Sequence, residues 1–386
     1  MNFRNASRST SLLSIVVPTK GRTSTLTWAL KTALCQHGDD VEILVSDNDT
    51  SSATKNLIDH LGDTKIRYVK TPRRLSMTDH WNFAISASRG DYVLVLGDDD
   101  GLLPDAVERV RRTIEIHRPD VIYGPMDFYR WPVGDEPGMV TWIARSGSDH
   151  EVDLLALRRR ILRMGGARWE TLPSVYRAFV HRRVLDELYV KTGKYCDSLI
   201  PDVYTGFAIA GLQPLRAFCL SYPIAICAMS YAPNQKPMPK INETEQQLAL
   251  SHIAEYDDLG YLVSLPPFFP RTFNSFAESM LLAVSRFPEE RRGSDLNYSA
   301  HLAWMLSWSR AADPFEIYRL RNDLQPFGFN FIEFAFWYSA YKVRHWYSHM
   351  LSRRIAKRSS NNVDLADVVS AAHYLMEWHR KTVRSR

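Results

Sequence analysis

Short apolar runs that alternate with helical patterns constrain the fold of this chain more than any other feature. The runs with the composition of buried strands cover residues 12–18, 41–47, 65–70 and 91–96. Each is followed by helical spacing or by helix start and stop signals, over residues 22–36, 51–62, 76–88 and 104–117. A further strand is expected at 120–124. Strands that alternate with helices predict a doubly wound, mostly parallel α/β sheet.

Polar side chains follow the strands at the points where they end. The groups are Thr19 to Arg22, Asp47 to Asp49, Arg73 with Arg74, and Asp98 to Asp100. Ligands of open α/β sheets bind outside the carboxyl ends of the strands. The four groups therefore predict one binding site along a single rim of the sheet.

Three consecutive aspartates, Asp98 to Asp100, end the fourth apolar run. Carboxylates that lie close together raise each other's pKa, and a single aspartate with glycine would suffice for a turn. Oxygen ligands of this kind suit Mg²⁺ and Mn²⁺. The triple aspartate predicts a site for a divalent cation (Mn²⁺ or Mg²⁺), and a solvated acidic turn is the alternative interpretation.

Composition limits the class of protein. The 386 residues carry a formal net charge of +5, without an Arg-rich repeat or an RNA-binding signature, so we expect no nucleic-acid partner. The four cysteines form no C-x-x-C pair and are expected to be reduced. No signal peptide is recognised, and no apolar run reaches the ~18 residues of a spanning helix. These features favour a cytoplasmic protein, with peripheral attachment to the inner face of a membrane as an alternative.

The chain divides into three parts. Residues 1–11 are expected to form a flexible N-terminus, 12–238 an α/β domain, and 239–386 a largely helical C-terminal region with a role in acceptor or membrane-surface contact. The soft boundary is the "KPMPK" segment at 236–240, and residues 125–150 predict a hairpin or loop.

Aromatic and basic residues crowd the segment 330–358, which contains no acidic residue after Glu333. Such a pattern suits an interfacial helix on an anionic membrane. A core helix buried all round, with a basic outer edge, also explains it, and this interpretation is favoured here.

Several motifs of this chain resemble those of the family-two glycosyltransferases, in the same order and at similar spacing. They are "SIVVPTKGR", "ILVSDND", "SMTDHWNFAISASRGDYVLVLGDDDGLLPD" and "PDVYTGFAIAG", within residues 12–235. The resemblance implies a GT-A fold and a metal-dependent, inverting enzyme that moves a sugar from a nucleotide-sugar donor, UDP-linked, to a hydroxyl. It also implies synthesis of a bacterial surface or exported glycan on a glycan or lipid-linked acceptor.

The chain departs from the family pattern at two places. The asparagine that usually follows the proline of the first motif is replaced, because this chain reads Pro18-Thr19-Lys20-Gly21-Arg22. At the second place, Gly97 stands in the first acidic position of "L-D-x-D-D". The second departure makes the metal-binding register ambiguous by one residue. The "Q-x-x-R-W" signature of processive synthases is absent, which favours transfer of a single sugar.

The resemblance assigns roles to residues of this chain. Asp47 would contact the nucleobase, Asp98 the ribose, and Asp99 and Asp100 the metal, while Asn82 would brace its helix near the sugar. Asp202 is the preferred catalytic base. The remaining donor-site candidates are Pro18, Thr19, Arg22, Arg73 and Arg74, the last two against the diphosphate.

The alternatives at these positions are structural. Asp47 could close an Asx turn, and Asp202 could simply complement a helix N-terminus. Asp197, Asp186 and Glu187 are the other candidates for the base. His80 and Trp81 could stack on a base or sugar, although a tryptophan in this setting is more often part of the core.

Two other functions remain open. A non-catalytic nucleotide-sugar-binding or scaffold protein of the same fold would keep the site without turnover. A sugar nucleotidyltransferase would want a glycine-rich phosphate loop after the first strand, and the single glycine in "PTKGRTS" argues against it.

Overall fold

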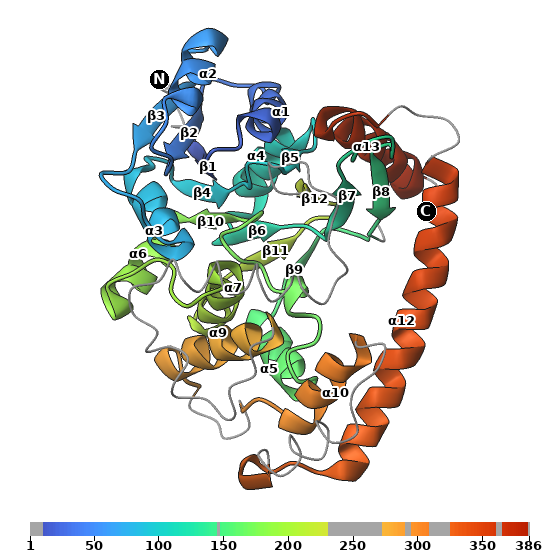
Figure 1. The fold of residues 1–386 in the computed structure, drawn as a ribbon. Coiled ribbons are helices and arrows are strands. Elements are labelled where there is room, and N and C mark those ends of the chain that lie inside the picture. Colours follow the sequence, from blue (N-terminus) through green and yellow to red (C-terminus); the bar gives the residue numbers. More distant parts are fainter. Residues whose placement is uncertain are drawn as a thin grey trace, which may run out of the picture.

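The computed structural model describes residues 11–144, 147–230, 272–289, 295–308, 325–359 and 365–384. An eight-stranded sheet with the order β3-β2-β1-β4-β10-β6-β11-β9 forms the centre of this part of the chain (Figure 1). Its parallel half consists of β1 (Leu13–Thr19), β2 (Val41–Asp47), β3 (Ile66–Lys70) and β4 (Tyr92–Val95). The other half contains β6 (Val121–Tyr123), β9 (His150–Val152), β10 (Phe179–His181) and β11 (Ala217–Cys219).

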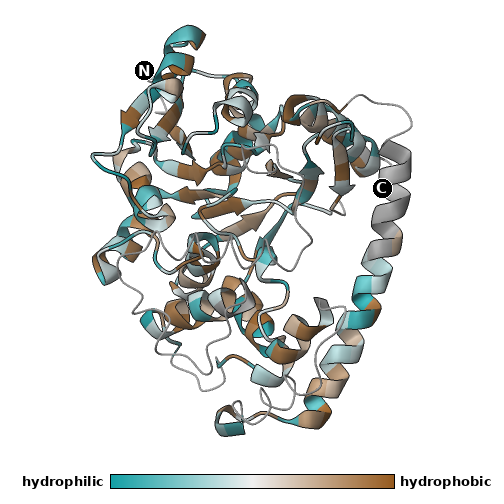
Figure 2. Cartoon of the chain, in the orientation of Figure 1, coloured by the Kyte–Doolittle hydropathy of each residue, from teal (hydrophilic) through white to brown (hydrophobic). Residues whose placement is uncertain are grey.

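Helices cover both faces of this sheet, as a doubly wound fold requires. On one face, α1 (Thr23–Leu34), α2 (Ala53–Leu61) and α4 (Ala106–His117) contribute to one hydrophobic core. On the other, α3 (Met77–Ala87), α5 (Leu154–Arg163), α6 (Arg182–Thr192) and α7 (Pro201–Gly211) share a second core. Figure 2 shows the hydrophobic colour gathered on the strands and on the helix surfaces that meet them. The predicted α/β class is confirmed.

A second sheet lies beside the first, with the order β5-β12-β7-β8. It contains β5 (Gly101–Leu102), β7 (Asp127–Arg130), β8 (Met139–Trp142) and β12 (Ala225–Met229). The hairpin predicted within 125–150 is confirmed as the antiparallel pair β7 and β8. The helix α13 (Val368–Arg384) packs its apolar side chains against this sheet.

The C-terminal third is helical where it is described, as predicted. It contains α9 (Thr272–Arg286), α10 (Tyr298–Trp308), a short 3₁₀ turn at Gln325–Phe327, α12 (Phe331–Ser359) and α13. The boundary expected at 236–240 and the N-terminal residues 1–10 lie outside the described residues. Among the described helices, none combines the length and the apolar character needed to cross a membrane.

The helix α12 runs along one side of the molecule (Figure 1). We expected it to be a core helix buried all round, and this prediction is wrong. Phe334 and Tyr341 are buried, but Ile332, Phe336 and Trp346 are largely exposed. Among the described side chains of α12, which lie within residues 331–350, only one face therefore packs on the rest of the described chain.

Candidate functional site

The rim of the central sheet brings the polar groups predicted from the sequence together. Thr19 and Asp47 end the neighbouring strands β1 and β2 and are register partners, as are Pro18 and Ser46. Asp98 follows β4, which lies on the other side of β1, and it accepts a hydrogen bond from Thr19 Oγ1 at 2.8 Å. The ends of three strands thus lie together at one rim of the sheet, as the α/β pattern predicted.

Arg22 bridges two of the three consecutive aspartates. Its Nη1 lies 2.8 Å from Asp98 Oδ1, and its Nη2 lies 2.6 Å from Asp99 Oδ2. Burial alone would lower the pKa of Arg22, but the two carboxylates outweigh it and raise that pKa. Gly21, with φ of +67°, makes the left-handed turn that leads into this position. The carboxylates therefore converge on one positive group.

Asp100 lies deepest of the three and is fully buried. Its Oδ1 accepts from the Ala228 N–H at 2.8 Å, and its Oδ2 accepts from the Tyr176 hydroxyl. A Cβ at Gly97 would stand 2.9 Å from both Asp100 Oδ2 and Tyr176 Oη. The space that a first acidic side chain would need is thus already filled, which explains the glycine in the "L-G-D-D-D" motif.

Burial makes ionisation of the acidic cluster unfavourable unless positive charge lies nearby. It raises the pKa of Asp98 to about 7 and that of Asp100 to about 6, and the neighbouring Asp99 adds to both shifts. Arg22 and Arg177 act in the opposite direction on Asp98 and Asp100, respectively. A cation bound here would stabilise the ionised carboxylates.

The donor set fits a divalent cation bound through few protein ligands. The described residues contain no group of three or more His, Cys, Asp or Glu arranged as a metal site. Both carboxylate oxygens of Asp98 have partners, Thr19 and Arg22, and both oxygens of Asp100 accept hydrogen bonds. In Asp99, by contrast, the contacts with Arg22 and Ser230 all involve Oδ2. No hydrogen bond from the described residues reaches Asp99 Oδ1, which could accept a cation. Mg²⁺ in proteins typically uses one or two carboxylates plus substrate phosphates.

Asp47 is fully buried at the end of β2. Its Oδ2 accepts from the Tyr68 hydroxyl at 2.8 Å, and its Oδ1 accepts from the Asp49 N–H at 3.0 Å. The second contact is the Asx-type turn that the sequence offered as the alternative. The turn and a ligand-binding role are compatible, since each carboxylate oxygen can accept a further hydrogen bond.

Arg73 and Arg74 lie exposed on the loop after β3. This loop is held by Asn48, whose Oδ1 accepts from the Leu75 N–H at 2.9 Å and from Thr71 Oγ1 at 3.0 Å. The structure places neither arginine in the acidic cluster. Asn48, in the predicted "SDND" turn, is the residue that orders the loop carrying them, and sequence reasoning assigned it no role.

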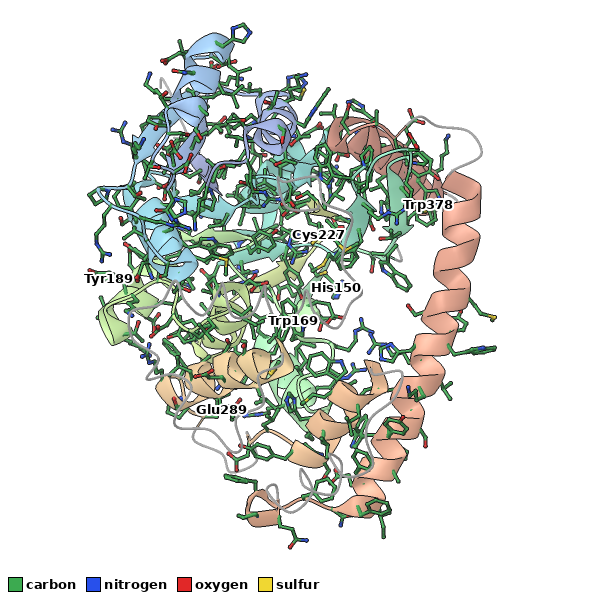
Figure 3. The ribbon with its side chains drawn as sticks, in the orientation of Figure 1. His150, Trp169, Tyr189, Cys227, Glu289 and Trp378 are labelled. Atoms are coloured by element: carbon green, nitrogen blue, oxygen red, sulfur yellow. The ribbon has the colours of Figure 1, made fainter. Side chains whose placement is uncertain are left out.

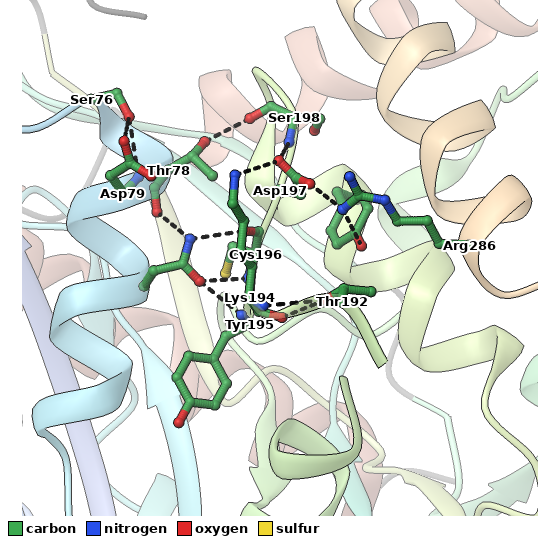
Figure 4. Close-up of polar contacts among 12 residues, drawn as sticks. Ser76, Thr78, Asp79, Thr192, Lys194, Tyr195, Cys196, Asp197, Ser198 and Arg286 are labelled. Atoms are coloured by element: carbon green, nitrogen blue, oxygen red, sulfur yellow. Dashed lines mark hydrogen bonds and ion pairs between the residues drawn. The ribbon is translucent and has the colours of Figure 1, made fainter. Parts of the chain in front are cut away.

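Asn82 braces the segment that leads to Asp202. Figure 4 shows Tyr195, Cys196 and Asp197 of this segment. Its Nδ2 donates to the Cys196 carbonyl at 2.8 Å, and its Oδ1 accepts from the Tyr195 and Cys196 N–H groups at 2.8 and 2.9 Å. Thr78, one turn earlier on α3, donates to the Ser198 carbonyl at 2.6 Å. The amide of Asn82 is therefore used in holding the chain.

Asp202 lies in the first turn of α7, directly after Pro201. Burial raises the pKa of the Asp202 carboxyl, and the nearby Arg177 guanidinium counteracts part of this rise. The other candidates for the base have structural partners or point to solvent. Asp197 is buried against Arg286 and Lys194, Glu187 pairs with Lys191 on the same helix, and Asp186 is exposed.

Arg177 is the residue that sequence reasoning missed. Its backbone is left-handed, with φ of +66°, and its guanidinium stacks 4.4 Å from the centre of the Tyr176 ring. Its Nε and Nη1 are buried, and no described residue accepts a hydrogen bond from them. Its charge acts on both Asp100 and Asp202. Arg177 thus lies between the acidic cluster and the candidate base.

A small pocket of about 30 Å³, open to solvent, adjoins this arginine. The side chains that line it include Tyr123, Trp169, Glu170, Tyr176, Arg177 and Ile224. Tyr123 ends β6, which runs parallel to the strands of the donor-side rim, so the pocket continues that rim. Figure 3 shows Trp169 and Cys227 in this central region.

His80 and Trp81 support the site from below. His80 Nε2 lies 3.0 Å from Ser46 Oγ, and burial lowers its pKa to about 4. Trp81 is buried and stacks on Tyr176, with 5.5 Å between ring centroids. Both side chains belong to the core beneath the rim, which agrees with the structural alternative given for this segment.

Comparisons with known proteins follow the same motifs. Residues 14–172 match the model of glycosyl transferase family 2. The succinoglycan biosynthesis protein ExoO of Rhizobium meliloti is 33% identical over 103 residues, which are 27% of this chain and 29% of that protein. A GalNAc(5)-diNAcBac-PP-undecaprenol beta-1,3-glucosyltransferase of Campylobacter jejuni is 34% identical over 98 residues, or 25% and 32% of the two chains. The alignments thus span about a third of each relative's length.

Solved structures with a similar arrangement include Staphylococcus aureus TarS 1-349 in complex with UDP-GlcNAc. That comparison has a TM-score of 0.49 and 16% identity, and it covers 82% of this chain and 80% of that one. The family model covers β1 to the short turn before Tyr176, which includes the acidic cluster and its partners on the rim. Over residues 14–172, this chain is therefore similar to glycosyl transferase family 2.

Proposed function

We propose that this protein is an inverting glycosyltransferase that moves a sugar from a nucleotide-sugar donor, UDP-linked, to a hydroxyl acceptor. One observation carries the proposal. Strand ends far apart in the sequence bring Thr19, Arg22, Asp47 and the aspartates 98–100 to one rim, with Asp202 held at a helix start beyond Arg177.

The donor half of the site is the β1–β2–β4 rim. Asp47, which lies beside Thr19, would accept from the N–H of a nucleobase, and Asp98, which accepts from Thr19, would accept from ribose hydroxyls. Asp99 would hold the cation through Oδ1, with Asp100 adding negative charge from below. Bound there, a divalent cation supplies Lewis-acid stabilisation of the negative charge that the leaving diphosphate develops. Arg22 would turn from the carboxylates to the phosphates when the donor arrives.

The acceptor half is the Asp202 side. The acceptor oxygen forms its bond to the anomeric carbon while the bond from that carbon to the diphosphate breaks. The attack comes from the face of the sugar opposite the leaving diphosphate, and Asp202 takes the proton of the attacking hydroxyl on that face. Arg177 holds Asp202 ionised for this step. The pocket beside Arg177 would receive the acceptor.

The biological setting is proposed from the relatives. One matched protein is named for succinoglycan biosynthesis, and another for transfer to an undecaprenol-linked saccharide. We propose that this chain likewise builds a bacterial surface or exported glycan, on a glycan or lipid-linked acceptor.

The donor site is tested by calorimetry of UDP binding with and without Mn²⁺, using wild type and Asp99→Asn. We expect Mn²⁺ to strengthen UDP binding in wild type and to have little effect in the variant, because the cation loses its carboxylate ligand. Asp59→Asn, which removes an exposed carboxylate from α2, is the matched control and should behave as wild type. Absence of binding to UDP, GDP, CDP and dTDP would leave the scaffold alternative in the lead.

The base is tested separately from the donor site. Asp202→Asn should bind UDP and Mn²⁺ like wild type but lose about 10²-fold or more in turnover of its UDP-sugar, because proton transfer from the acceptor has no partner. Turnover is followed as UDP release from a panel of UDP-sugars. Equal turnover of Asp202→Asn and wild type would remove Asp202 from the chemistry.

A further inference from the structure

The helix α12 has one packed face and one solvent face, and the two differ in an unexpected way. On the packed face, Tyr341 is buried and its hydroxyl donates to the Met164 carbonyl at 2.7 Å. On the same face, His345 Nε2 lies 2.9 Å from Ser307 Oγ on α10, and Phe334 is buried. These contacts fix the rotation of the helix about its axis.

The opposite face carries an apolar stripe that only Ser339 interrupts. Each member lies three, four or seven residues from another member, so all six share one side of an α-helix. Each is between 37 and 80% exposed: Ile332, Phe336, Val343, Trp346, Tyr347 and Met350. We call these six residues the outer stripe. A surface helix normally turns such a stripe toward the core, and a large exposed apolar patch marks an interaction site.

The charge of α12 indicates what covers the outer stripe. The helix holds six basic residues and one acid, Glu333, at its first turn. Lys342 and Arg344 flank Val343 directly in the sequence. Lys342 lies over the Tyr338 ring, and Arg344 lies 3.9 Å from Glu170. Aromatic and aliphatic side chains next to basic ones suit an anionic lipid surface, which takes the apolar groups between its head groups and attracts the cations.

We propose that the outer stripe of α12 docks on a membrane that contains anionic lipid, with the helix lying in the plane of the surface. A second copy of the chain would also cover apolar residues, but it would bring two strongly basic helices together. Helix pairs of that kind are stabilised by opposite charges beside the seam, and α12 offers no acid after Glu333. Charge complementarity therefore favours the membrane.

Vesicle co-sedimentation tests this proposal without any donor or acceptor, so its outcome is independent of the transferase activity. The full chain is mixed with vesicles of phosphatidylcholine, with or without roughly 30% phosphatidylglycerol, at low and high salt. We expect at least about 10-fold stronger binding to the anionic vesicles, decreasing with salt. Phe336→Ser with Trp346→Ser should reduce that binding roughly 10-fold or more, because two exposed aromatic rings no longer enter the interface.

The control removes two equally exposed apolar side chains elsewhere, Ile116→Ser on α4 with Val190→Ser on α6. It should bind as wild type, and circular dichroism should show all three proteins folded. Equal vesicle binding by the stripe variant and wild type would overturn the proposal, as would a lack of binding to anionic vesicles. Light scattering adds one further outcome. A wild-type dimer that the stripe variant converts to monomer would assign the outer stripe to a second copy and overturn membrane docking.

Discussion

Arg177 is the residue that connects the two parts of the candidate site, the acidic cluster and the candidate base. Its charge acts on two carboxylates for which we propose different roles, Asp100 in the acidic cluster and Asp202 at the start of α7. A bulky residue in the left-handed region costs on the order of 1–3 kcal/mol, and such strain concentrates at functional sites. In addition, the buried Nε and Nη1 of Arg177 have no hydrogen-bond acceptor among the described residues. This combination favours a role in binding or catalysis over a structural one.

We predict that Arg177→Ala lowers turnover by about 10²-fold at pH 7 and by less at pH 9. Without the guanidinium, burial raises the pKa of Asp202 further, so more of the base is protonated at neutral pH and less at high pH. A pH profile of UDP release measures this effect. Arg177→Lys keeps the charge and should keep the wild-type profile. A loss that is the same at every pH would point to a purely structural role.

At the residue scale, the sequence was informative where position along a strand decides position in space. Thr19, Asp47 and Asp98 follow parallel strands, so their gathering could be predicted from the alternation of strands and helices. The position of Arg177 could not be predicted, because its left-handed backbone and its burial depend on packing against Tyr176. The local sequence "SVYRAF" contains no motif that indicates either feature.

At the scale of elements, α9 contains a buried acidic side chain, Glu278, that lacks a hydrogen-bond donor for one of its oxygens among the described residues. Glu278 is 4% exposed, its Oε1 receives no hydrogen bond from the described residues, and burial raises its pKa to about 8. The folded protein therefore binds a proton at Glu278 that the unfolded chain, with its ordinary pKa, releases above about pH 4.5.

This difference predicts a stability change with a definite sign. Glu278 is most favourable to folding below pH 4.5, and its contribution is lost progressively as the pH rises to about 8. Between pH 5 and pH 8, the free energy of unfolding of wild type should fall by roughly 2–3 kcal/mol relative to Glu278→Gln, whose neutral amide does not titrate. Urea unfolding of both proteins at the two pH values measures the difference. Parallel pH dependences would show that Glu278 ionises freely in the folded state.

The elements themselves divide into those that local patterns predict and those that need partners. The strands and helices from β1 to α4 lie within a few residues of their predicted ranges, because each has an apolar run and its own boundary signals. The sheet β5-β12-β7-β8 was not predicted as a unit. Its strand β5 has two residues, and β12 pairs with β7 across about a hundred residues, which no local pattern contains.

At the scale of the whole molecule, the C-terminal helix α13 is connected to the acidic cluster through the second sheet. Asp127 on β7 and His379 on α13 are fully buried, with 2.7 Å between Asp127 Oδ2 and His379 Nε2. On the same sheet side, Trp131 Nε1 donates to the Asp99 carbonyl at 3.0 Å. The sheet thus links a helix near the end of the chain to the residue proposed to hold the cation.

We predict that His379→Ala destabilises the protein by about 3–5 kcal/mol, because it leaves the Asp127 carboxyl buried without its partner. The same variant should weaken Mn²⁺-dependent UDP binding at temperatures below unfolding, since β7 leads directly to Trp131. His379→Gln, which retains a hydrogen-bond donor, should lose less of both properties. Thermal unfolding and calorimetry measure the two effects on the same samples. Normal UDP binding by a destabilised but folded His379→Ala protein would show that α13 stabilises the second sheet without positioning Asp99, and the link between the two would then be mechanical support alone.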